Sequence, residues 1–138
     1  MSLLNVYDVA PRDAKYRGGI SALNAITASV AGVGVFHAGV QIGGDEWSYG
    51  WSARGSGVYR CDPKAAKCAT FRKTVSCGRT PLSRQARQIA IANLTLEWTG
   101  ASYELLQRNC CSFCEALCAA LRVRAPPRWL NALATALA

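Results

Sequence analysis

The stretch RNCCSFCEALCAAL, residues 108–121, decides how the C-terminal half of the chain is expected to fold. Asn109 is a preferred helix N-cap residue, and it predicts a helix from Cys110 to Arg122. Within this helix apolar side chains recur three or four residues apart, at Cys110, Phe113, Cys114, Leu117, Cys118 and Leu121. This spacing forms one apolar stripe, so the helix is expected to pack against a buried core.

The first half of the chain predicts strands. Apolar and β-branched segments bounded by turn residues indicate strands over residues 3–9, 35–42, 46–51, 57–61 and 70–76. Gly43-Gly44-Asp45 predicts the turn of a hairpin between the second and third of these strands. Residues 11–19 are expected to form a loop, and residues 20–33 either a short helix or an extended insertion.

Helices dominate the second half. Ser83 is a good N-cap and predicts a helix that ends near Gly100. Residues 128–137 predict a short last helix after the Pro126-Pro127 break. Strands first and helices afterwards indicate an α+β fold, with a small antiparallel sheet packed on helices. A length of 138 residues suits one domain, over residues 1–138.

The composition is typical of a compact globular domain. Hydrophobic residues make up 51% of the chain, and no apolar run reaches the roughly 18–20 residues of a membrane span. The net charge of +8 indicates either attraction to an acidic partner or a solubilising surface. Because the basic residues are scattered along the chain, the solubilising surface is favoured and no nucleic-acid partner is expected.

The seven cysteines are expected to be reduced thiols. Their number is odd and the N-terminal residues lack the features of a secretory signal, which argues against a disulfide framework. We therefore expect a protein of the cytoplasm, and of the nucleus as an alternative. Four thiols lie along one predicted helix without a matching pair elsewhere, so core packing is favoured over zinc. We expect neither a metal nor a cofactor.

His37, the only histidine, is the first candidate for chemistry. Side chains alternate between the two faces of a strand. The predicted strand over residues 35–42 therefore has one uniformly apolar face, formed by Phe36, Ala38, Val40 and Ile42. His37 lies on the opposite face. A lone histidine on a strand is more often structural than catalytic, although its side chain titrates near neutral pH.

Cys110 is the candidate nucleophile because it begins a helix. A thiolate there faces the positive end of the helix dipole and unpaired backbone N–H groups, which lower the pKa of a cysteine and can hold an oxyanion. The alternative role is a small buried hydrophobic residue. Cys111 has the same dipole but lies about 100° around the helix, on a face with Glu115 and Cys118. Cys110 is therefore the better placed to meet a base on the sheet.

The remaining candidates for substrate binding or for an oxyanion site are Gln41, Asn109, Cys111 and Tyr7. Gln41 shares the predicted face of His37, where it either orients a reacting carbonyl group or is a solvated strand residue. Asn109 and Cys111 flank the candidate nucleophile. Tyr7, on the first predicted strand, is a candidate for lining a cleft.

Segments along nearly the whole chain resemble one family, in order. They are NVYDV at 5–9, FHAGVQI at 36–42, EWSYG at 46–50, GRTPLS at 78–83, GASYELL at 100–106, RNCCSF at 108–113 and PRWLN at 127–131. Together these segments resemble the PPPDE peptidases, or deSUMOylating isopeptidases, which have a permuted papain-like fold. The chain departs from the family pattern in having Cys111 where an Asn is typical, and in a longer, more apolar segment over residues 18–34.

The resemblance implies a catalytic pair, His37 and Cys110. It also implies a cysteine isopeptidase that removes SUMO or ubiquitin from proteins through an acyl-enzyme, and a homodimer with active sites near the interface. A protein S-acyl (palmitoyl) thioesterase with the same pair, acting on S-acylated proteins, is the alternative enzyme. A basic protein-binding module is the non-enzymatic alternative.

Overall fold

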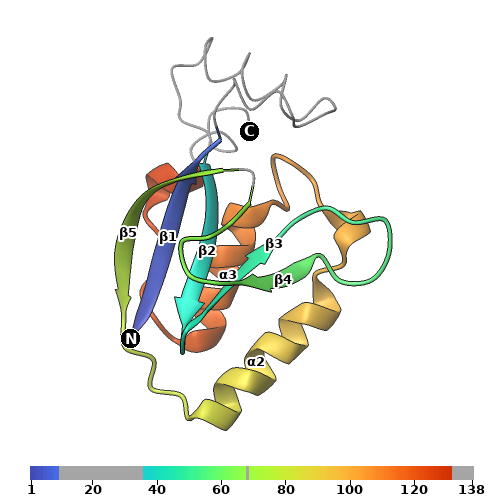
Figure 1. The fold of residues 1–138 in the computed structure, drawn as a ribbon. Helices are drawn as coiled ribbons and strands as arrows, with labels where there is room; N and C mark the ends of the chain where they lie inside the picture. Colours follow the sequence, from blue (N-terminus) through green and yellow to red (C-terminus); the bar gives the residue numbers. More distant parts are fainter. Residues whose placement is uncertain (10–35, 68, 132–138) are drawn as a thin grey trace.

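The computed structural model describes residues 1–9, 36–67 and 69–131, and their fold is organised around one sheet (Figure 1). Within these ranges the strands are β1 Ser2–Asp8, β2 Phe36–Ile42, β3 Asp45–Tyr49, β4 Val58–Cys61 and β5 Thr70–Gly78. They form a five-stranded antiparallel sheet in the order β4-β3-β2-β1-β5. The predicted α+β class and antiparallel sheet are therefore confirmed, with strand ends that differ from the predicted ones by a few residues.

The two faces of the sheet differ because side chains alternate along each strand. Leu4 pairs with Val40, and Val6 pairs with Ala38. These four side chains are wholly buried and belong to the hydrophobic core, together with the buried side of α3. The predicted apolar face of β2 is thus confirmed. The opposite face carries polar side chains, including His37.

Helix α3, Cys110–Leu121, lies behind the sheet in Figure 1 and contacts β2. Its N-cap is Asn109, whose side chain accepts a hydrogen bond from the Ser112 backbone N–H, while the Ser112 hydroxyl accepts one from the Asn109 N–H. This capping box fixes the first turn. Every residue of the predicted apolar stripe is buried, as the spacing required.

Helix α2, Arg84–Glu97, begins after the N-cap Ser83 and packs beside α3. Its contact with the core comes through Leu94 and the following Trp98, both buried. Ile89 is 55% exposed, because it lies five residues before Leu94 and so about 140° around the helix from the buried side. The predicted end at Gly100 is slightly late, since a separate 3-10 turn, η1 Gly100–Ser102, follows the helix.

The predicted last helix is described only at its start, where η2, Arg128–Asn131, is a 3-10 turn. Residues 132–137 of that prediction lie outside the described residues, as do the predicted loop over 11–19 and the insertion over 20–33. Within the part of the chain that the structure describes, no helix combines the length and the hydropathy of a membrane span.

Shortening a buried side chain of α3 should lower the free energy of unfolding more than shortening an exposed leucine. Leu117 is wholly buried, and Leu117→Ala is expected to lower the free energy of unfolding by about 2–5 kcal/mol, through lost burial and a cavity. Leu96 on α2 is 80% exposed, so Leu96→Ala should change it by less than about 0.5 kcal/mol. Urea unfolding followed by circular dichroism measures both, and equal losses would contradict this packing.

Candidate active site

Cys110 lies where the start of α3 meets the first residues of β2. Among the described residues, β2 pairs with β3 only through Val40, Gln41 and Ile42, so the two strands separate toward Phe36. The Cys110 Sγ atom lies 3.8 Å from the Phe36 carbonyl oxygen and is almost wholly buried. The capping box and this contact fix the position of the thiol.

The surroundings of Cys110 favour its thiolate. A hydrogen bond from the Cys111 thiol is the largest cause that lowers the pKa of Cys110, and it acts against burial, which raises it. The charge of His37 and a hydrogen bond from its ring lower the pKa of Cys110 further, so that it falls well below the ordinary value. The structure therefore brings together the two residues that the sequence singled out.

His37 is half-buried on β2, opposite Tyr7 of β1, and the two ring centroids are 5.4 Å apart. Burial lowers the pKa of His37, but the Cys110 thiolate outweighs it through its charge and a hydrogen bond, with a further contribution from Glu46. The net result is a raised pKa. A raised imidazole pKa beside a lowered thiol pKa describes a thiolate–imidazolium pair.

Cys111 occupies a different environment from the one its helical phase predicts. Its Sγ atom lies 3.6 Å from the Phe36 carbonyl oxygen and 3.5 Å from that of Leu130, and the side chain is 3% exposed. Helical phase predicts that Cys111 lies away from the core stripe, but η2 packs over this side of α3 and buries it. Its hydrogen bond to Cys110, followed by burial, raises the pKa of Cys111 well above the ordinary value. Cys111 is therefore a protonated neighbour that donates to the thiolate.

The other sequence candidates are already engaged with the protein. The Gln41 side-chain oxygen accepts a hydrogen bond from Asn5, and Gln41 lies four residues along β2 from His37, about 13 Å away. The Asn109 amide caps α3 and donates to the Leu105 carbonyl oxygen. Tyr7, 1% exposed, packs against His37 instead of facing solvent. The structure therefore places Asn109 and Tyr7 beside the pair, and Gln41 away from it.

Glu46 is a part of the site that the sequence reasoning missed. Its carboxylate is wholly buried and accepts hydrogen bonds from Asn5 Nδ2 at 2.6 Å, Tyr7 Oη at 2.7 Å and the Lys64 backbone N–H at 2.9 Å. Hairpin register would have indicated it, because Glu46 pairs with Gln41 and so lies on the face of His37. The same alternation places Ser48 on this face.

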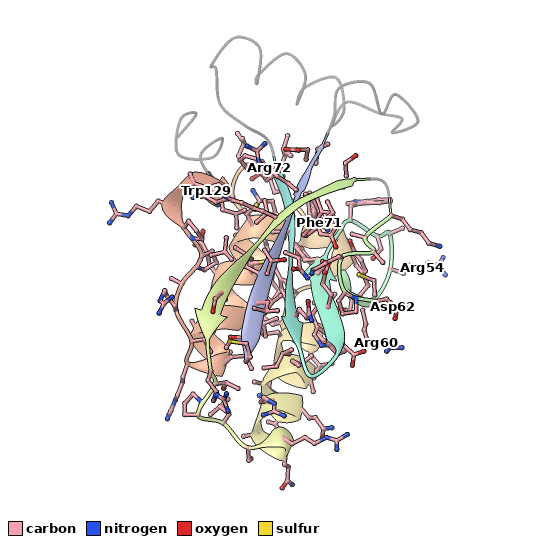
Figure 2. The ribbon with its side chains drawn as sticks, turned by 60° about the vertical axis from the view of Figure 1, so that its left-hand side comes forward. Arg54, Arg60, Asp62, Phe71, Arg72 and Trp129 are labelled. Carbon is pink, nitrogen blue, oxygen red and sulfur yellow. The ribbon has the colours of Figure 1, made fainter. Side chains whose placement is uncertain are left out.

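Two aromatic groups border the pair on other sides. The ring of Phe36 packs edge-on against Trp129 of η2, with centroids 5.3 Å apart, and the Arg72 guanidinium lies over the Phe36 ring. Figure 2 shows Trp129 and Arg72 at the same end of the sheet. Tyr103 borders Cys110: burial raises its pKa, and the charge of Cys110 raises it further, so its hydroxyl keeps its proton.

No metal arrangement is found in the ranges that the structure describes. Within residues 1–9, 36–67 and 69–131, no three His, Cys, Asp or Glu side chains are grouped so that they could hold a metal ion. The cysteines in these ranges are free thiols, at Cys61, Cys77, Cys110, Cys111, Cys114 and Cys118.

Fold and site together define a class: a small α+β domain in which a cysteine at a helix start pairs with a histidine on the sheet. A family model described as the PPPDE putative peptidase domain matches residues 1–138. This chain belongs to the PPPDE putative peptidase family.

Curated proteins with similar sequences include three from distant organisms. A DeSI-like protein of Arabidopsis thaliana is 34% identical over 104 residues, covering 75% of this chain and 46% of the relative. A desumoylating isopeptidase 1 homolog of Caenorhabditis elegans is 33% identical over 112 residues, covering 78% and 34%. The DeSI-like protein sdu1 of Schizosaccharomyces pombe is 30% identical over 131 residues, covering 93% and 61%. The matched part is thus less than two thirds of each relative's length.

The thiolate–imidazolium pair should be visible as reactivity at acidic pH. Because its pKa is lowered, Cys110 is expected to react with iodoacetamide at pH 6, where a cysteine of ordinary pKa near 8.5 is almost wholly protonated. The rate should rise with pH through the lowered pKa of Cys110 and then level off. His37→Ala removes the cation, so the pKa should rise and the rate at pH 6 should fall at least about tenfold. Peptide mass spectrometry that distinguishes Cys110 from Cys111 measures the rate, and an unchanged rate in His37→Ala would contradict the pair.

Glu46 should be important for stability because four donors, from Asn5, Tyr7, Cys61 and the Lys64 backbone, converge on its carboxylate. Glu46→Gln keeps the size but places an amide NH₂ against one of these donors. The free energy of unfolding is expected to fall by about 1–3 kcal/mol. Glu97→Gln, at an exposed position of α2, is the matched control and should change it by less than about 0.5 kcal/mol. Urea unfolding at pH 7 compares the two, and similar values would refute the role of the buried carboxylate.

Proposed function

We propose that this chain is a cysteine isopeptidase that removes a ubiquitin-like modifier from proteins, with Cys110 as the nucleophile and His37 as the general base and acid. The observation that carries the proposal is the lowered pKa of Cys110 beside the raised pKa of His37. Membership of a peptidase family supports the reaction class. The similarity to the Caenorhabditis elegans desumoylating isopeptidase 1 homolog supports SUMO as the modifier.

The reaction begins when the Cys110 thiolate attacks the carbonyl carbon of the isopeptide bond. The carbonyl electrons move to oxygen, and the first-turn backbone N–H groups of α3 that the Asn109 cap leaves free stabilise this oxyanion. His37 then gives its proton to the departing lysine amine, and the C–N bond breaks. The modifier is left as a thioester on Cys110.

Water completes the reaction. Neutral His37 takes a proton from a water molecule, which attacks the thioester carbonyl carbon. The C–S bond breaks, the modifier leaves with a free carboxylate, and the Cys110 thiolate is restored beside the His37 imidazolium. Each cycle therefore consumes one water molecule and needs no electron donor or acceptor.

Activity assays on the chain with single substitutions test this proposal. With a SUMO-isopeptide substrate, Cys110→Ala is expected to abolish cleavage and His37→Ala to reduce kcat by about 10²–10⁴. Cys111→Ala removes a donor to the thiolate but not the nucleophile, so it should keep activity within about tenfold. Thermal melting of each variant checks that it folds.

A thiol-directed activity probe on the same variants separates the alternatives. Labelling that survives Cys110→Ala and disappears in Cys111→Ala would show that the nucleophile is wrongly assigned. Cleavage of an S-acylated peptide with no cleavage of SUMO or ubiquitin conjugates would favour a thioesterase. Function that persists unchanged in Cys110→Ala would favour a binding module.

A further inference from the structure

Two hydroxyl groups contact the His37 ring at one nitrogen. The Ser48 Oγ atom lies 3.4 Å from His37 Nε2, and the Tyr59 hydroxyl oxygen lies 3.5 Å from the same nitrogen. Ser48 and Tyr59 are opposite each other in the β3–β4 ladder. Both hydroxyls are therefore presented to Nε2 by the sheet, whereas Cys110 comes from α3.

The Ser48 hydroxyl has a partner for its own proton. Its Oγ atom lies 3.3 Å from the Ala38 carbonyl oxygen, to which it donates. With its proton directed to Ala38, the oxygen of Ser48 presents lone pairs to His37, and so it accepts the Nε2–H. A fixed acceptor at Nε2 keeps the neutral ring in the tautomer whose Nδ1 is free to take a proton.

The position of Ser48 is fixed by close packing. The residue is wholly buried, and a Cβ atom built at Gly39 on β2 would lie 2.6 Å from Ser48 Oγ. The absence of a side chain at Gly39 thus lets Ser48 and Glu46 fill this space. A buried, tightly packed hydroxyl loses little additional freedom when it holds a ring in place.

We propose that Ser48, with Tyr59 beside it, is a positioning residue that accepts the Nε2–H of His37 and so directs Nδ1 to the Cys110 thiol. The proposal rests on the proposed function in one respect only, that Cys110 exchanges a proton with the His37 ring. During the reaction the Nε2 proton stays in place, and the proton exchanged with Cys110, the leaving amine and water is the one on Nδ1. Ser48 thus takes the place of a third member beside the cysteine and histidine.

Nuclear magnetic resonance of the imidazole tests this directly, because His37 is the only histidine in the chain. In ¹⁵N-labelled Cys110→Ala protein, the neutral ring is expected to carry its proton on Nε2. Adding Ser48→Ala should shift the population toward the Nδ1–H tautomer, and Tyr59→Phe should shift it less. A neutral ring that is protonated on Nδ1 while Ser48 is intact, or a tautomer unmoved by Ser48→Ala, overturns the proposal.

Kinetics give the second readout. In the active chain, Ser48→Ala is expected to lower kcat about tenfold with little change in KM, and to move the alkaline limb of the pH profile to lower pH. The sign follows because losing an acceptor for the charged ring lowers the pKa of His37, so the imidazolium is lost sooner as pH rises. Ser76→Ala, on β5, is the control, since the Ser76 hydroxyl contacts Met1 and Gly78.

The outcomes separate this proposal from the proposed function. If His37→Ala leaves the iodoacetamide reactivity of Cys110 unchanged, the catalytic pair fails. If His37→Ala changes that reactivity but Ser48→Ala changes neither the tautomer nor the pH profile, the pair stands and the role of Ser48 is refuted. Tyr59→Phe keeps the proposal testable if the Ser48 variants misfold, since Tyr59 is 41% exposed and loss of its hydroxyl is expected to leave the fold intact.

Discussion

The buried carboxylate of Glu46 is the constraint on which the site depends. A charge without solvent is tolerated only when donors surround it, and Glu46 takes its donors from three segments: Asn5 and Tyr7 on β1, the Cys61 thiol on β4, and the Lys64 backbone in the β4–β5 connection. Because the carboxylate lies on β3 and two of its donors lie on β1, meeting this requirement fixes the register of both strands with β2, which lies between them. It also fixes the Tyr7 ring, which packs against His37.

The two faces of the sheet differ in polarity. The face toward α3 is apolar at Leu4, Val6 and Val40, which lets the helix pack closely. The other face holds Glu46 and the hydroxyl of Ser48. Cys110 and His37 lie where β2 separates from β3, so the thiol of one layer reaches the imidazole of the other. The site is therefore a consequence of strand divergence together with the capped start of α3.

Periodicity predicted what depends on neighbours in sequence, and it failed where distant segments meet. The stripe of α3, its cap at Asn109 and the apolar face of β2 all follow from local spacing, and the structure confirms them. The burial of Cys111 depends on η2, which returns to α3 from further along the chain. The contacts of Ser48 and Tyr59 with His37 need the β3–β4 register, which no local pattern contains.

The Cys111 thiol affects how readily Cys110 loses its proton to form the thiolate–imidazolium pair with His37. A neutral Cys111 that donates to Cys110 stabilises the thiolate, and this adds to the effect of the His37 cation. A more stable thiolate is present at lower pH but attacks more weakly, because nucleophilicity falls as the pKa falls. The imidazolium partner suffers no such loss, since it must only keep its proton until the amine leaves. Cys111 therefore keeps the Cys110 thiolate present at lower pH, while it lowers the intrinsic rate at which that thiolate attacks. Ser48 acts at alkaline pH, where its oxygen helps the His37 ring to keep its charge.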